Sequence, residues 1–179
     1  MFPAFLENPT NCFFEGQDQN ENILLLVRAH PITNLTWVIL AIFVFLIPFI
    51  VPIATPFLNV NLQAVPDIYL IALTVVDYLF VLIITFEGFL SWYFNVTIVT
   101  NKRVYDIDFH AILLKNVNLA PLENIEETDS SQGGVFGLIF NYGNVTVQTA
   151  GANIAVTMKN VPNAAYIADF ILDLSQEVQ

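Results

Sequence analysis

Two stretches in the first half of the chain are almost wholly apolar. The first occupies residues 34–55 and has no charged side chain, and the second occupies residues 68–92. A helix needs about 20 apolar residues to cross the hydrocarbon core of a bilayer, and each stretch supplies them. A buried core helix of a soluble protein rarely stays free of charge over such a length. The pattern therefore predicts two membrane-spanning helices.

The connector between these helices, residues 56–67, is short, so the two helices are expected to form an antiparallel hairpin. It contains two prolines and no Lys or Arg. Arg28 lies just before the hairpin, and Lys102 and Arg103 lie just after it. Because cytoplasmic flanks of membrane helices are enriched in Lys and Arg, this distribution predicts a multi-pass protein of the cell membrane with both termini cytoplasmic.

From Tyr93 onward, apolar and polar residues alternate with a period of two, which is typical of strands. About seven short strands are expected. Six of them are delimited by turn residues, at positions 94–99, 104–109, 112–117, 122–128, 145–148 and 154–158. The glycine-rich stretch at 133–137 lacks the ending of a phosphate-binding loop and is predicted to be a flexible connection between strands.

The last predicted element is an amphipathic helix at residues 163–176. Its apolar residues recur at i, i+3, i+4 and i+7, at Ile167, Phe170, Ile171 and Leu174. Pro162 lies near its start, where a missing N–H costs nothing. Residues 93–179 are therefore expected to form one small β domain closed by this helix.

Residues 1–33 are predicted to be an appendage of this arrangement. Residues 1–22 are polar, acidic and rich in asparagine, which favours a loosely ordered arm. Residues 21–30 are predicted to be a helical lead that lies on the membrane surface.

Composition and charge narrow the classes of partner. The formal net charge is -11, from 16 acidic and 5 basic residues, whereas nucleic-acid binding requires a basic face. Residues 93–179 contain four basic and nine acidic residues, a net charge of -5. This charge also opposes docking on anionic headgroups. The single cysteine, Cys12, cannot form an internal disulfide.

Several short motifs occur in a fixed order along the chain. One is a strand–turn–strand with Thr100, Asn101 and Arg103 at the turn. Further motif positions are Pro121, Leu122, Ile125, Tyr142, Gly143, Gly151 and Pro162. Together these motifs resemble those of bacterial pleckstrin-homology-like, membrane-flanked domains of the YdbS-like type. Phe14–Gln17, with Glu21, Arg28 and His30, resembles the lead that precedes the helices in small members, so the resemblance covers residues 14–176.

The resemblance implies a PH-like fold: two antiparallel sheets with about seven strands and a C-terminal capping helix. It does not imply phosphoinositide binding, because one fold hosts many functions. Lys102 and Arg103 form the only local basic pair of the β domain. Their position after the second helix favours an interfacial basic pair that anchors to headgroups, rather than a ligand pocket.

Two carboxyl groups, Asp77 and Glu87, lie inside the second predicted membrane helix. An ionisable residue within a membrane helix is a functional-site hypothesis by default. A separation of ten residues places the two about 80° apart around a helix. They indicate either a protonatable site or polar contact in an oligomer, or else a protonated Asp77 bonded to the neighbouring helix with Glu87 reaching the interface.

No other residues suggest catalysis or metal binding. The acidic residues of the β domain follow no calcium-loop spacing, and His30 and His110 are too separated for a zinc site. Cys12 has no neighbouring base and is a poor nucleophile candidate. We therefore expect no catalytic site, cofactor, metal or small-molecule substrate.

The sequence leaves three hypotheses for function. The first is a non-enzymatic interaction or scaffolding module, anchored in the bilayer and binding a protein partner or a second copy. The second is a domain that binds lipid headgroups. The third is a small oligomeric transport or proton-coupled element built around Asp77 and Glu87, because two membrane helices make a pathway only when several copies assemble.

Overall fold

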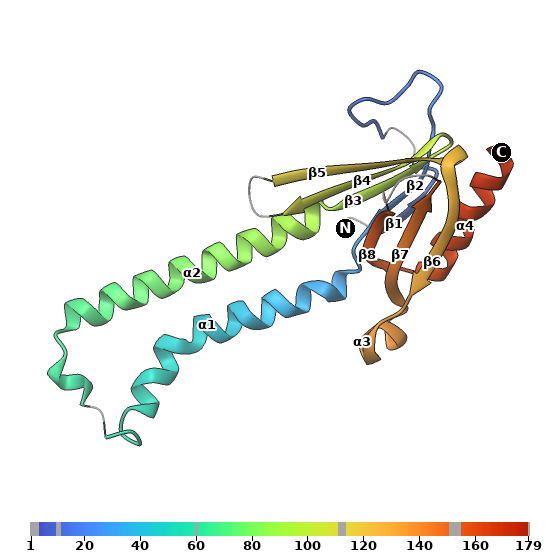
Figure 1. The fold of residues 1–179 in the computed structure, drawn as a ribbon. Coiled ribbons are helices and arrows are strands. Elements are labelled where there is room, and N and C mark those ends of the chain that lie inside the picture. The colour runs from blue at the N-terminus through green and yellow to red at the C-terminus, as the bar shows by residue number, and fades with distance from the viewer. Residues whose placement is uncertain (1–3, 10–11, 60, 111–113, 151–154, 179) are drawn as a thin grey trace. The chain divides into compact units, whose positions relative to one another are not determined.

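The computed structural model describes residues 4–9, 12–59, 61–110, 114–150 and 155–178. The chain divides into two compact units (Figure 1). Unit 1 comprises residues 1–33 and 91–179, and unit 2 comprises residues 34–90. The long apolar stretches thus belong to one unit, and the β-forming segments on both sides of them belong to the other.

A five-stranded antiparallel sheet forms one layer of unit 1, with the strands in chain order. Its members are β1 (Phe5–Glu7), β2 (Ile23–Arg28), β3 (Val96–Thr100), β4 (Arg103–His110) and β5 (Leu114–Pro121). The turn at Thr100–Arg103 connects β3 and β4, as the sequence predicts. The strand predicted at 112–117 is confirmed in type but extends to Pro121.

A three-stranded antiparallel sheet forms the second layer. It contains β6 (Ile125–Ser131), β7 (Tyr142–Thr149) and β8 (Ala155–Pro162). The predicted strand at 122–128 begins later, because Leu122–Asn124 forms a 3-10 turn, η3. The region around 133–137, predicted to be a loop, contains the short helix α3 (Gly134–Ile139). Glycine content alone was misleading there, because four of the six α3 residues are apolar.

The C-terminal helix α4 (Ala164–Val178) packs against β6, β7 and η3. Of the four apolar residues predicted to face the sheets, Ile167 and Ile171 are fully buried, and Phe170 and Leu174 are partly buried against the same core. The core also takes Val99 and Val104 from the first sheet and Val145, Val147 and Val156 from the second. The two-sheet PH-like architecture with a capping helix is therefore confirmed.

The helical lead predicted at residues 21–30 is wrong, because this segment forms the strand β2. Ile23, Leu25 and Val27 are buried, and the residues between them are half-buried. Leu24 and Leu26 are also apolar, so the sequence obscures the period of two that the sheet imposes. β2 pairs with β1 on one side and β3 on the other.

Residues 1–33 are therefore part of the β domain rather than an appendage to it. The last residue of β2, Arg28, pairs with the first residue of β3, Val96. The hairpin is an insertion between two neighbouring, hydrogen-bonded strands. Residues 93–179, to which the sequence assigned the whole domain, lack β1 and β2. Of these two strands, β2 contributes Leu25 and Val27 to the core.

Unit 2 consists of the two predicted helices, α1 (Leu35–Ala54) and α2 (Asp67–Phe94, whose last four residues belong to unit 1). The helices pack closely at Gly88, where an added Cβ would lie 2.5 Å from the Trp37 ring. The rings of Phe45 and Tyr78 stack with centroids 5.5 Å apart. Both helices are long and apolar enough to cross a membrane.

Candidate functional site

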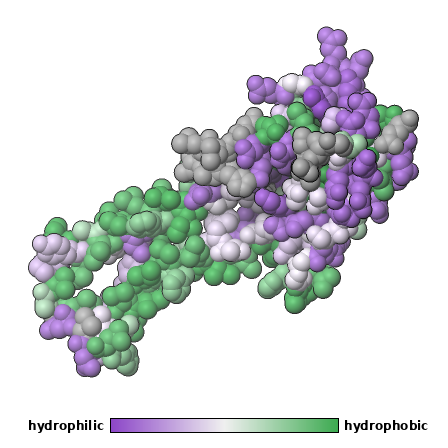
Figure 2. All heavy atoms as spheres, in the orientation of Figure 1, coloured by the Kyte–Doolittle hydropathy of each residue, from purple (hydrophilic) through white to green (hydrophobic). Residues whose placement is uncertain are grey.

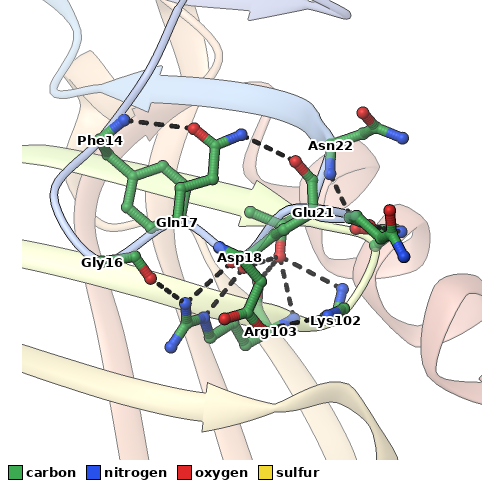
Figure 3. Close-up of polar contacts among 11 residues, drawn as sticks. Phe14, Gly16, Gln17, Asp18, Glu21, Asn22, Lys102 and Arg103 are labelled. Carbon is green, nitrogen blue, oxygen red and sulfur yellow. Dashed lines mark hydrogen bonds and ion pairs between the residues drawn. The ribbon is translucent and has the colours of Figure 1, made fainter.

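The most elaborate polar cluster in unit 1 is centred on an ion pair between Arg103 and Glu21 (Figure 3). Arg103 opens β4, and Glu21 lies two residues before β2. The guanidinium Nε and Nη2 donate to the two carboxylate oxygens at 2.9 and 2.8 Å. This bidentate geometry is the strong form of an arginine–carboxylate contact. The Glu21 side chain is fully buried, and that of Arg103 is 25% exposed.

Two further donors satisfy the Glu21 carboxylate. The Thr100 hydroxyl donates to Oε1 at 2.8 Å, and the Asp18 backbone N–H donates to Oε2 at 3.0 Å. The hydrogen bonds from Arg103, more than any other contact, lower the pKa of Glu21 from its ordinary 4.5 to about 2, although burial opposes them. The same contact raises the pKa of Arg103. Both groups are therefore charged at neutral pH.

The cluster holds residues 14–22, which we term the N-terminal strap, against the β3–β4 turn. Arg103 Nη2 also donates to the Gly16 carbonyl at 2.7 Å, and its guanidinium lies 5.9 Å from the centre of the Phe14 ring. The Asn101 side chain accepts from the Asn22 N–H at 2.9 Å and donates to the Asn20 carbonyl at 3.2 Å. The turn motif is thus a latch for the strap.

The latch gives Lys102 and Arg103 partners that the sequence did not suggest. They were expected to be an interfacial basic pair beside the exit of the second helix, and the length of β3 lies between them and that exit. Arg103 pairs with Glu21, and Lys102 Nζ lies 3.0 Å from Asp18 Oδ2. Both cations therefore have carboxylate partners, and anchoring to headgroups stays a prediction.

The other motif positions also have structural roles. Leu122 and Ile125 are buried in the core, and Pro121 ends β5 in an extended conformation. At Gly143, an added Cβ would collide with the Ser131 carbonyl oxygen on β6, so only glycine allows the two strands this approach. Pro162 ends β8 just before α4. Gly151 lies outside the described residues.

This arrangement indicates a structural latch rather than a catalytic centre. Both oxygens of Glu21 are engaged by donors of the chain itself, so the carboxylate has no role left as a base. The sequence marks Glu21 as part of the lead that resembles the family, but it gives no sign of the pairing with Arg103, which is 82 positions away. The available signal was a motif arginine in a chain with only five basic residues.

The family model of the bacterial PH domain matches residues 23–175. This range begins at the first residue of β2 and extends into α4, so it includes the strand that precedes the hairpin. The chain belongs to the bacterial PH domain family. The resemblance found in the motifs is thereby confirmed, and the latch and core positions above are features of this bacterial PH domain.

Comparison with solved structures finds a DUF1696 family protein with a pleckstrin-homology domain from Shewanella loihica PV-4. It is 16% identical, and the match covers 45% of this chain and 70% of that chain, with a TM-score of 0.36. At this TM-score it adds nothing to the family assignment. No curated protein matches the chain.

The two carboxyl groups of α2 do not form a joint site. Glu87 is exposed, whereas Asp77 is half-buried. Asp77 Oδ2 is shielded and has no hydrogen-bond partner among the described residues. The predicted bond from Asp77 to the neighbouring helix is therefore absent for this oxygen. By contrast, Thr74 and Thr85 donate to the carbonyls of Leu70 and Val81 in their own helix.

Unit 2 also has an apolar groove of about 500 Å³. Its lining residues come from both helices: Phe45 of α1, and Tyr78, Val81, Leu82, Thr85, Phe86 and Phe89 of α2. No charged side chain lines it, and the polar side chains in the lining are the hydroxyl-bearing Tyr78 and Thr85.

His30 has a packing role in the bacterial PH domain. Its ring stacks on Tyr142 with centroids 5.6 Å apart, and its Nδ1 accepts the N–H of Ile32 at 3.2 Å. Burial lowers its pKa, which favours the neutral form at pH 7. Among the described residues, no group of His, Cys, Asp and Glu is arranged to hold a metal ion.

Proposed function

We propose that this bacterial PH domain is a membrane-anchored, non-enzymatic interaction module. Its hairpin crosses the cell membrane twice, and its β domain lies on the cytoplasmic face, where it binds a protein partner or a second copy of the chain. The observation that carries the anchoring is the exposure of the hairpin's apolar side chains. Ala41 is the one buried residue of α1, and α2 has none.

This exposure also favours membrane helices over the alternative that the sequence already disfavours, a buried core helix of a soluble protein. The core helix of a soluble protein is also apolar, but it buries its side chains against its own fold. Here the residues of α1 and α2 from Ile39 to Ile53 and from Ile68 to Phe89 include many exposed large apolar side chains. Because burying apolar surface is the main favourable term in folding, such helices require an apolar environment such as lipid.

The insertion point supports two crossings. Arg28 and Val96 are neighbours across a strand pair, so the chain must return to the side of the membrane from which it left. An even number of crossings follows, with residues before and after the hairpin on one side. A cleaved signal sequence ending in α1 would remove β2 from the sheet, which argues against that alternative.

Cysteine labelling tests this topology in the full-length chain. With Cys12→Ser as background, we expect a membrane-impermeant maleimide applied from outside to modify Asn61→Cys and to spare Gln176→Cys. Both positions should react equally once the membrane is permeabilised. Labelling of Gln176→Cys alone would reverse the orientation, and labelling of neither before permeabilisation would remove the connector from the outer face.

A protein partner is favoured over a headgroup by the surface of unit 1. β5 lies at an edge of the five-stranded sheet, and its Val117 and Leu119 are exposed two positions apart on one face. Edge strands pair readily with other chains. Three cations of the unit, in contrast, have carboxylate partners: Lys102 and Arg103 lie in the latch, and Lys159 Nζ is 3.6 Å from Asp108 Oδ2.

The interaction is tested on the full chain extracted in mild detergent. We expect an oligomer, or a co-purifying protein, whose association is weakened by Val117→Glu with Leu119→Glu. Val178→Glu is the matched control, because Val178 is also an exposed apolar residue but lies at the end of α4. Equal association in all three chains would exclude the β5 edge as the contact.

A second candidate function rests on Asp77, whose Oδ2 is shielded and unpartnered. Such a group in a membrane helix favours a protonatable site in an oligomer. Asp77→Asn in proteoliposomes should then abolish any proton flux and leave oligomerisation unchanged. Flux equal to that of protein-free liposomes in the parent chain would eliminate this candidate.

A further inference from the structure

The helix α3 is an exposed apolar element on a domain whose other apolar side chains largely face inward. Residues 133–140 contain no charged residue. Val135, Phe136, Leu138 and Ile139 are each between 60% and 69% exposed. In Figure 2 the apolar residues at the position of α3 form a patch on the β domain. Exposed patches of this kind mark interaction sites more often than chance.

The structure holds α3 firmly at its base. Gln132 precedes α3 and Asn141 follows it. Gln132 Nε2 donates to Asn141 Oδ1 at 2.9 Å, so this hydrogen bond joins the two ends of the α3 segment. The Asn163 N–H donates to the Asn141 carbonyl at 2.9 Å, which ties the base to the start of α4. At Gly137, an added Cβ would lie 3.1 Å from the Tyr142 carbonyl oxygen. The helix is thus presented on a closed base, with its apolar side chains outward.

The base of α3 lies where the hairpin joins unit 1. The Phe140 ring centre is 6.4 Å from that of His30, and His30 stacks on Tyr142. α1 begins five residues after His30, a reach of at most ~18 Å. On the returning side, Trp92 Nε1 donates to the Ala29 carbonyl at 2.9 Å. The residues of unit 1 that lead into and out of the hairpin, Ala29, His30 and Trp92, therefore lie close to the base of α3.

We propose that α3 inserts its apolar side chains into the interfacial region of the bilayer that the hairpin spans. This inference rests on the proposed anchoring. Phenylalanine and branched aliphatic side chains without charge suit the boundary between headgroups and acyl chains. Because the chain has a net charge of -11, anionic lipid would repel it, so burial of apolar side chains must drive this contact. The occupant is thus the same apolar phase that covers α1 and α2.

The proposal gives the β domain a second attachment besides the hairpin. Two contacts at the same end restrict the tilt of a domain that would otherwise pivot on its connections to α1 and α2. With α3 in the interface, the opposite end of unit 1, which carries the latch, is held away from the bilayer. The β5 edge is then presented in a fixed orientation to a partner on the cytoplasmic face.

Depth-dependent fluorescence quenching tests this on the full-length chain, reconstituted at one copy per neutral-lipid nanodisc. An environment-sensitive label is placed at Phe136→Cys or Ile139→Cys in the Cys12→Ser background. Phe13→Cys is the matched control, because Phe13 is an exposed phenylalanine, 86% exposed, beside the strap. Phe80→Cys, in the middle of α2, reports on the hairpin itself.

We expect lipids with a nitroxide near the headgroup to quench the labels at 136 and 139 several-fold more than the label at 13. Nitroxide near the chain end should quench the label at 80. If 80 is quenched but 136 and 139 behave like 13, α3 is outside the bilayer and this proposal fails alone. If 80 is not quenched, the anchoring fails first. Shielding at 136 only in discs with several copies would assign the patch to self-association instead.

Discussion

The two units of this chain use the same kinds of apolar side chain in opposite ways. In unit 1, Val, Leu and Ile from both sheets and from α4 are directed at one another and lose their contact with solvent. In unit 2, most side chains of α1 and α2 are apolar, and many of the large ones remain exposed. Unit 1 therefore supplies its own apolar environment, whereas unit 2 requires one from outside.

The difference teaches which parts of the chain depend on each other. No residue of α1 or α2 belongs to the buried core of unit 1, although the hairpin interrupts the fold between two paired strands. Residues 1–33, in contrast, supply Leu25 and Val27 to that core. Sequence adjacency suggested the reverse, with the N-terminal segment serving the membrane helices. The predictions below test this division, beginning with the largest effect.

The largest effect on folding is expected from a comparison of two deletions, one of the hairpin and one of everything before residue 93. A variant in which a short Gly-Ser linker replaces residues 34–90 should be soluble and fold cooperatively, because Arg28 and Val96 already pair. Residues 93–179 alone should fail to fold, because they lack β1 and β2. Far-UV circular dichroism and thermal unfolding measure both. A cooperative transition in residues 93–179 alone would contradict the division.

The second effect concerns the latch, measured by urea unfolding of the linker variant. Glu21→Gln removes the charge that pairs with a largely buried Arg103, and such a loss costs about 3 kcal/mol or more. Asp18→Asn is the matched control: its ion pair with Lys102 is exposed, and exposed pairs contribute less than about 1 kcal/mol. Equal destabilisation by the two substitutions would remove the latch from the stability of unit 1.

The latch also has a pH signature with a definite sign. Glu21 has a folded pKa of about 2 against an ordinary 4.5, so its contribution is complete above pH 4.5. It is lost as the pH falls from 4.5 through 2. Burial instead raises the pKa of Asp106 above its ordinary 3.8. The folded state therefore disfavours the charged carboxylate, and Asp106 destabilises the fold as the pH rises above 3.8. The parent should lose its advantage over Glu21→Gln on acidification, whereas Asp106→Asn should gain stability at neutral pH.

Much of the architecture was predictable, because long or regular patterns dominate it. The two helices, the β3–β4 turn and α4 follow from uninterrupted apolar runs, turn residues and a helical stripe. β2 was not, because Leu24 and Leu26 fill the alternate positions and erase its period. The latch was not, because Glu21 and Arg103 meet only through the fold. α3 was missed because its glycines were given more weight than its apolar residues.

The third effect is a difference in stability loss between two residues of the apolar stripe of α4, Ile171 and Phe170. Ile171→Ala should cost about 2–5 kcal/mol, because Ile171 is fully buried. Phe170→Ala should lower the free energy of unfolding by less for each atom removed, because Phe170 is only partly buried. Its ring stacks on Tyr166, with ring centroids 6.1 Å apart. Urea unfolding of the linker variant gives both values. A larger loss for Phe170→Ala would mean that the core extends further over α4 than its burial indicates.

The smallest effect is expected in binding to anionic lipid, although PH domains are commonly associated with lipid headgroups. Each unpaired Lys or Arg near an anionic surface contributes about 1 kcal/mol, but Lys102, Arg103 and Lys159 all have carboxylate partners. The linker variant should therefore bind anionic and neutral vesicles equally at physiological salt, with any shared affinity coming from α3. Lys102→Ala should change neither binding nor, by more than about 1 kcal/mol, stability.

Co-sedimentation with vesicles of matched size measures this comparison, and salt provides its internal control. An apolar contact through α3 is insensitive to ionic strength, whereas binding through lysine and arginine weakens as salt screens it. A clear preference for anionic vesicles that disappears in high salt and in Lys102→Ala would mean that headgroups can displace Asp18 from Lys102. The headgroup-binding hypothesis would then replace the protein-interaction one for this end of the β domain.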